Sequence, residues 1–119
     1  MTELSLREKQ SLFVRLSIHL ISYILEKGYE VTYGDTYRDP RCPYGSDRSL
    51  HRKRLAIDLN LFKDGKFLAA TEDHRQFGEY WESLHPDCCW GGSLKHESTG
   101  TDFLTNDGNH YSLRHEGLE

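Results

Sequence analysis

The sequence lacks a long hydrophobic run and an excess of positive charge. Its most apolar stretch, residues 12–25, is interrupted by Arg15, Ser17, His19 and Ser22, so we expect no segment to insert into a bilayer. Fifteen Lys and Arg against nineteen Asp and Glu give a formal net charge of −4. Nucleic-acid-binding proteins usually carry a basic face, so this charge balance disfavours a nucleic-acid partner.

Cysteine is also scarce. Cys42, Cys88 and Cys89 are an odd number, and no C-x-x-C spacing occurs. Adjacent cysteines do not easily bridge each other, and the number is odd, so a disulfide framework is disfavoured. Because no C-x-x-C spacing occurs, a structural zinc knuckle is disfavoured as well. We therefore expect three reduced thiols. The N-terminus also lacks the basic start and unbroken apolar run of a secretory signal peptide.

The length of 119 residues predicts a single domain spanning 1–119. Ser5 and Glu8 form a capping-box pattern that begins a helix, and Gly28 ends it. An apolar stripe follows at helical spacing, made of Val14, Ile18, Ile21 and Leu25 and widened by Leu16, Leu20 and Ile24. The next patterns predict a strand at 29–33, a long loop at 34–49, and a hairpin whose strand at 55–62 turns at Asp64-Gly65 and returns through 67–69. A helix around 77–84, a loop and a last strand at 110–113 follow. This order predicts an α+β fold with a small antiparallel sheet flanked by helices.

Histidine is abundant, with seven in the chain. In the strand at 55–62, alternation places Asp58 on the face opposite Ile57, Leu59 and Leu61, where a carboxylate is a site candidate. His51 precedes this strand and His110 begins the last one. One Asp and two His from separate segments suit a catalytic zinc site with a fourth position for water. Taken singly, each is more often an ordinary loop, turn or surface residue.

The combined motifs resemble those of the zinc D,D-carboxypeptidase and endolysin peptidase family, which cleaves peptidoglycan peptides. Ser49-x-His51 and Ala56-x-Asp58 match its first motif, and Asp107-x-x-His110 matches its second. The Trp90-Gly91-Gly92 tripeptide is similar to one found in the phage endolysins of this family. Residues 34–38 are similar to the family's segment before the first zinc ligand, which carries a substrate-binding Arg. The resemblance covers about Tyr33 to Ser112 and implies a Hedgehog/D,D-peptidase-like fold.

The resemblance also implies roles for particular residues. His51, Asp58 and His110 would hold one Zn²⁺ per chain, which would acidify a water and polarise the scissile carbonyl. Asp107 would accept the water's proton and pass it to the leaving amine. Arg38 would bind a substrate carboxylate. The expected substrate is a peptidoglycan stem peptide and the expected state is a monomer.

The Trp90-Gly91-Gly92 tripeptide, which resembles one in phage endolysins, favours an L-Ala-D-Glu endopeptidase. We expect no separate wall-binding domain. Such a protein would be made in the bacterial cytoplasm, with a phage or prophage origin, and would reach the wall by a separate route. A D-Ala-D-Ala carboxypeptidase stays open, because both substrates present a free carboxylate to Arg38. A non-catalytic zinc-holding wall-binding module and a metal-dependent nuclease are rivals from other classes. One position departs from the family: Arg54 stands where many members have Gly, so the local backbone is expected to differ.

Several other residues receive ordinary interpretations. We expect Trp81 to lie in the core and Trp90 to lie either in the core or along the cleft. We expect His19 in a packing role or at the surface. The other histidines outside the motif are expected at the surface, and they are His74, His85, His96 and His115.

Overall fold

The computed structural model describes residues 4–34, 53–92 and 108–115. In chain order its elements are α1 (Leu6–Glu26), β1 (Glu30–Tyr33), β2 (Ala56–Lys63), β3 (Lys66–Leu68), the 3₁₀ helix η2 (Thr71–His74), α2 (Arg75–Leu84), β4 (Cys88–Trp90) and β5 (His110–Leu113). The predicted order of helix, strand, hairpin, helix and strand is found, but one additional strand, β4, lies between α2 and β5, where a loop was expected. The loop predicted at 34–49 lies outside the described residues beyond Gly34.

Helix α1 begins where the sequence predicts. The Ser5 side chain accepts a hydrogen bond from the Glu8 amide, and the Glu8 carboxylate accepts one from the Ser5 amide. This reciprocal pair satisfies two amides that the first turn leaves without helical partners. At the other end, Gly28 adopts a positive φ of 88°, which a residue without a Cβ adopts at little cost.

The apolar stripe of α1 was predicted partly on the wrong face. The buried residues are Phe13, Leu16, Leu20 and Ile24. Val14, Ile18 and Leu25 are instead more than half exposed. Two apolar rows run side by side along this helix, so helical spacing alone does not identify which row packs on the sheet.

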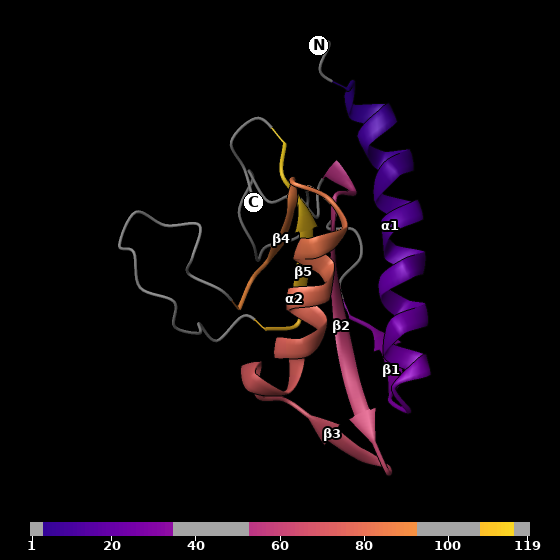
Figure 1. Ribbon diagram of the computed structural model, residues 1–119, viewed down its shortest axis with the longest axis vertical. Coiled ribbons are helices and arrows are strands. Elements are labelled where there is room, and N and C mark those ends of the chain that lie inside the picture. The colour runs from indigo at the N-terminus through magenta and orange to yellow at the C-terminus, as the bar shows by residue number, and fades with distance from the viewer. Residues whose placement is uncertain (1–3, 35–52, 93–107, 116–119) are drawn as a thin grey trace, which may run out of the picture.

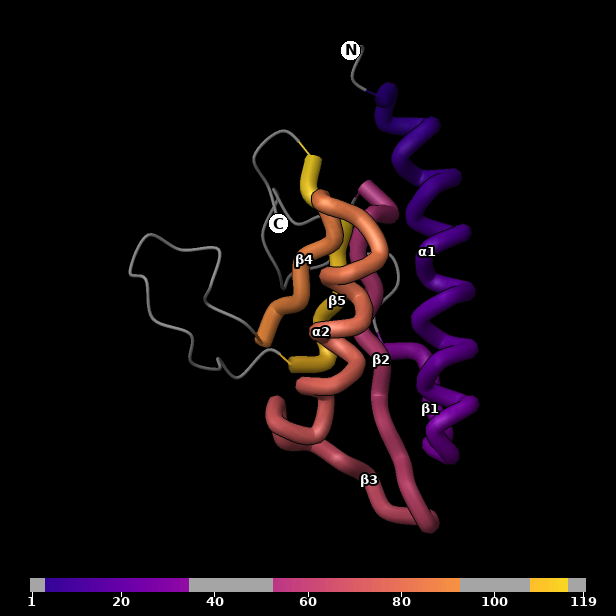
Figure 2. The backbone as a smooth tube through the Cα atoms, in the orientation of Figure 1, coloured from indigo at the N-terminus to yellow at the C-terminus, as the bar shows by residue number. Residues whose placement is uncertain are grey.

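The sheet is antiparallel and centred on β2. β1 pairs with one edge of β2, and β3 and β5 share the other edge, so the path across the sheet is β1-β2-β5-β4. In Figure 2, β3 lies against the lower part of β2 and β5 against the upper part. The β2–β3 turn has positive φ at both Asp64 and Gly65, as the Asp-Gly pair predicts.

Both helices contribute to one hydrophobic core on one face of the sheet (Figure 1). Trp81 of α2 is fully buried and makes edge-on ring contacts with Phe13 of α1 and Tyr111 of β5. Ile57, Leu59 and Leu61 face this core from β2, as alternation predicts. Strand β4 was not predicted, because its three residues, Cys-Cys-Trp, are all buried and show no alternation. No helix among the described residues is long and apolar enough to cross a membrane.

Candidate metal centre

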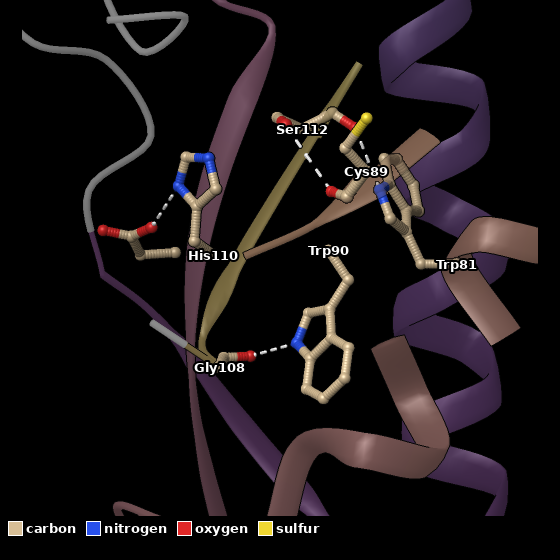
Figure 3. Close-up of polar contacts among 7 residues, drawn as sticks. Trp81, Cys89, Trp90, Gly108, His110 and Ser112 are labelled. Carbon is tan, nitrogen blue, oxygen red and sulfur yellow. Dashed lines mark hydrogen bonds and ion pairs between the residues drawn. The ribbon is translucent and has the colours of Figure 1, made fainter. Parts of the chain in front are cut away.

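Asp58 and His110 meet on the face of the sheet opposite the core. They are directly paired across the β2–β5 ladder, and directly paired residues project their side chains from the same face. His110 Nδ1 lies 3.2 Å from Asp58 Oδ1 (Figure 3). Figure 3 also shows the His110 ring on one side of β5, with the indoles of Trp81 and Trp90 on the other. The strand pattern therefore brings together two of the predicted ligands.

The Asp58–His110 geometry fits two ligands of one zinc ion. Zinc binds imidazole nitrogen and carboxylate oxygen at about 2.0–2.2 Å, so two tetrahedral ligand atoms lie about 3.3 Å apart. The side chains of His110 and Asp58 are only 15% and 20% exposed, which shields a bound ion from bulk water. The same distance also suits a direct hydrogen bond or ion pair. The chemistry of the two donors fits Zn²⁺, and both belong to the set predicted from the sequence.

Glycines flank the Asp58–His110 pair on both sides, Gly34 directly after β1 and Gly91 directly after β4. Gly34 donates its amide to the Asp58 carbonyl at 2.7 Å, and Gly91 donates its amide to the His110 carbonyl at 2.8 Å. A Cβ on Gly34 would lie 3.1 Å from both the Cβ and the carbonyl oxygen of Asp58, closer than an ordinary van der Waals contact. The two candidate ligands therefore have no side chain beside them in the same row of the sheet.

The other three predicted site residues, Arg38, His51 and Asp107, lie outside the described residues. Within residues 4–34, 53–92 and 108–115, no group of three or more His, Cys, Asp or Glu could hold a metal ion. The described part of the chain thus contains two residues of the predicted ligand set, Asp58 and His110. The assignments of His51 as third ligand, Asp107 as base and Arg38 as substrate contact stay predictions.

Arg54 has the backbone conformation that glycine favours. Its φ is +58°, in the left-handed region that L-residues with a Cβ adopt only at a cost. Many members of the peptidase family have Gly at this position. Arg54 thus adopts a conformation that a glycine would adopt more easily, and the expectation that the backbone here differs from that of the family stays a prediction.

The turn before His110 contains contacts that sequence reasoning missed. Trp90 is 3% exposed, and its indole Nε1 donates to the Gly108 carbonyl at 2.6 Å (Figure 3). The Gly108 amide donates to Thr71 Oγ1 at 3.3 Å. Trp90 therefore lies in the core under this turn. In the sequence, only the Trp-Gly-Gly tripeptide drew attention to Trp90, and it was compatible with a place either in the core or along the cleft.

The prediction that His74 and His115 lie at the surface is wrong, because both are buried. His74 is 1% exposed and His115 is 8% exposed. His74 Nδ1 lies 2.8 Å from the Tyr111 hydroxyl. Burial lowers the pKa of His74 to about 4, with a smaller opposing effect from Asp73, and burial raises the pKa of Tyr111. The two groups are thus neutral at pH 7 and form an uncharged hydrogen bond below β5. His96 lies outside the described residues, and His85 is half-buried.

Neither Cys88 nor Cys89 is in a disulfide, as predicted, and Cys42 lies outside the described residues. Burial raises the pKa of Cys88 to about 12, with smaller effects from neighbouring charges that include Cys89 and Asp87. A thiol with so high a pKa is protonated at neutral pH and is a poor nucleophile or metal ligand. Cys88 is therefore not a candidate catalytic residue.

Comparisons with known proteins give no assignment. No known family matches this chain in a scan of its sequence, and no curated protein matches it at a significant level.

Proposed function

We propose that this chain is a zinc-dependent peptidase of the Hedgehog/D,D-peptidase-like fold, acting on peptidoglycan stem peptides. The proposed bond is L-Ala-D-Glu, as in phage endolysins. One observation carries the proposal: Asp58 and His110, separated by 52 residues in sequence, pair across β2 and β5 with ligand atoms 3.2 Å apart. These are the two described members of the ligand set that the family motif names.

Two further features support the proposal. The α+β fold with a small antiparallel sheet is compatible with the general class of the proposed fold. The left-handed Arg54 also lies where the family motif has Gly, four residues before Asp58. Glycine is the residue that adopts a positive φ at least cost, so this backbone conformation is compatible with the Gly of the family motif.

The proposed mechanism assigns each motif residue one task. His51, Asp58 and His110 would hold the ion, and a bound Zn²⁺ supplies a Lewis acid that polarises a carbonyl and makes water more acidic. Asp107 takes the proton of the attacking water and delivers it to the leaving amine. Arg38 binds the α-carboxylate beside the scissile bond through its fork of donors.

Zinc content tests the ligand assignment directly. Wild type should carry one zinc per chain, and both Asp58→Asn and His110→Ala should lose it. Asp64→Asn and His19→Ala are matched controls, because both residues are exposed, Asp64 in the β2–β3 turn and His19 on α1. If the Asp58–His110 contact were only an ion pair, wild type would bind no more zinc than its variants. Stoichiometric zinc without cleavage would favour the wall-binding module.

A further inference from the structure

Helix α1 carries a second apolar row besides the one that packs in the core. Val14, Ile18, Ile21 and Leu25 follow one another at intervals of four, three and four residues, which is the spacing of a coiled-coil seam. Val14, Ile18 and Leu25 are more than half exposed, and Ile21 is partly buried. In Figure 1, α1 lies along one side of the molecule, with β1 beside its C-terminal half. The helix is therefore apolar on a side that the core does not use.

Tyr33 of β1 extends this row toward the sheet. It pairs directly with Leu59 of β2, so its side chain projects from the core face of the sheet, on the side of α1. Tyr33 is nevertheless 67% exposed. Two hollows of about 420 and 250 Å³ lie beside it, and both are lined by Ile21 and Tyr33. Tyr33 thus lies next to the middle of the row. The four row residues and Tyr33 together are called the α1 seam.

The α1 seam is large enough to form an interface. At about 150–250 Å² for a fully exposed residue of these sizes, its four most exposed members present roughly 400 Å². The largest apolar patch on a monomer is usually about 300–600 Å², and such a patch is often functional. Two copies of the seam facing each other would remove roughly 800 Å² from water, and flanking residues would bring the total near the ~1,000 Å² of a specific interface.

The charges beside the seam favour a second copy of α1 in the antiparallel direction. At about 3.6 residues per turn, Arg15 and Glu26 project from the same flank of the row, Arg15 near its start and Glu26 near its end. Both residues are exposed. An antiparallel second helix brings Arg15 of each copy beside Glu26 of the other, whereas a parallel one places like charges at the same height. A membrane-binding helix would instead carry mainly Lys and Arg beside its apolar face.

We propose that the α1 seam is the interface of a two-fold dimer, in which α1 of one copy packs antiparallel on α1 of a second copy. The surface is self-complementary, as a two-fold interface requires, because the apolar row meets itself and each basic end meets an acidic end. Asp58 and His110 lie on the opposite face of the sheet, so the dimer leaves them uncovered. The inference therefore does not depend on the proposed function, and it replaces the monomer expected from the sequence.

Sedimentation velocity of the full chain over a wide concentration range tests the dimer. Wild type should pass from the mass of one chain to that of two at micromolar concentrations. Ile18→Glu should weaken association at least about 100-fold, because each dimer would then bury two carboxylates in the apolar seam. His19→Glu is the matched control: it adds the same charge at the next position, which is exposed and lies about 100° further round the helix, and should associate like wild type. Circular dichroism would verify that both variants are folded.

A charge exchange tests the direction of the helices. Arg15→Glu and Glu26→Arg should each weaken the dimer about 3- to 10-fold, because each places like charges together at two symmetric positions. The variant that carries both substitutions restores opposite charges and should associate like wild type. Single variants that associate as well as wild type would contradict the antiparallel arrangement, because a parallel pair has no Arg15–Glu26 contact to lose.

Two results would overturn the inference as a whole. The first is a wild type that stays monomeric at every concentration. The second is a dimer that Ile18→Glu leaves intact, since its interface would then lie elsewhere. Sedimentation with vesicles of phosphatidylcholine and phosphatidylglycerol completes the test: a monomeric wild type that binds these vesicles, and loses binding in Ile18→Glu, would assign the seam to a lipid surface instead.

Discussion

Replacing Arg54 with glycine should relieve strain in the backbone at this position. Arg54 is exposed and has a φ of +58°, a conformation that costs an L-residue about 1–2 kcal/mol. Glycine avoids this cost but loses more backbone entropy on folding, about 0.5–1 kcal/mol. For the backbone alone, the difference is a gain of roughly 0.5–1 kcal/mol in the free energy of unfolding, and the loss of the side-chain interactions of Arg54 reduces this gain. For a domain of this size the backbone gain alone corresponds to about 2–4 °C in Tm.

Arg54→Ala is the control for this experiment, because alanine removes the guanidinium and all its contacts but keeps the Cβ. Urea and thermal unfolding followed by circular dichroism would compare the two variants under the same zinc loading. Arg54→Gly should exceed Arg54→Ala in stability by about 1 kcal/mol. If the two variants were equally stable, the left-handed conformation would not be strained, and Arg54 would no longer support the likeness to a glycine-containing turn.

Four further outcomes follow from the site and the core. Folding lowers the pKa of His74 from about 6.5 to about 4. Between these pH values the unfolded chain binds a proton at His74 and the folded chain does not. The free energy of unfolding should therefore fall by roughly 2–3 kcal/mol as the pH is lowered from 6.5 to 4. Urea unfolding across this pH range should show a clearly smaller decline in His74→Gln, and an unchanged decline would refute the cause. Gly78→Ala should destabilise the protein by about 2–3 kcal/mol in urea unfolding, because its Cβ would overlap the Trp90 ring; a neutral effect would contradict that packing. Asp107→Ala should keep its zinc by elemental analysis and lose about 10²–10⁴-fold in kcat, whereas loss of the metal would make Asp107 a ligand. Stem peptides with a free D-Glu α-carboxylate should be cleaved about 10- to 150-fold faster than amidated ones, and Arg38→Ala should erase most of that preference in kcat/KM.

The local elements of the fold could be predicted because their signals lie close together in the sequence. The Ser5–Glu8 capping box and the Asp64-Gly65 turn each specify their own backbone geometry within four residues. The buried face of α1 could not be predicted in the same way. Whether Val14 or Phe13 faces the sheet depends on where β2 and α2 lie, and no local pattern encodes that placement.

For the candidate site too, features encoded locally could be predicted and contacts between distant segments could not. Alternation along β2 predicts the face on which Asp58 lies, but the pairing of Asp58 with His110 is a register between distant strands. The contacts of Gly108 with Trp90 and Thr71, and that of His74 with Tyr111, join residues 18 to 37 positions apart. A single sequence gives no signal for such contacts, so a buried histidine and a core indole were both open to other interpretations.

Mass spectrometry of purified peptidoglycan digested with this protein tests the central claim most directly. The account predicts fragments with new L-Ala carboxyl and D-Glu amino termini, which disappear with a chelator and return when zinc is restored. Release of D-Ala with the L-Ala-D-Glu bond intact would establish the carboxypeptidase instead. Undigested peptidoglycan in the presence of stoichiometrically zinc-loaded protein would contradict the proposal that this chain is a peptidase.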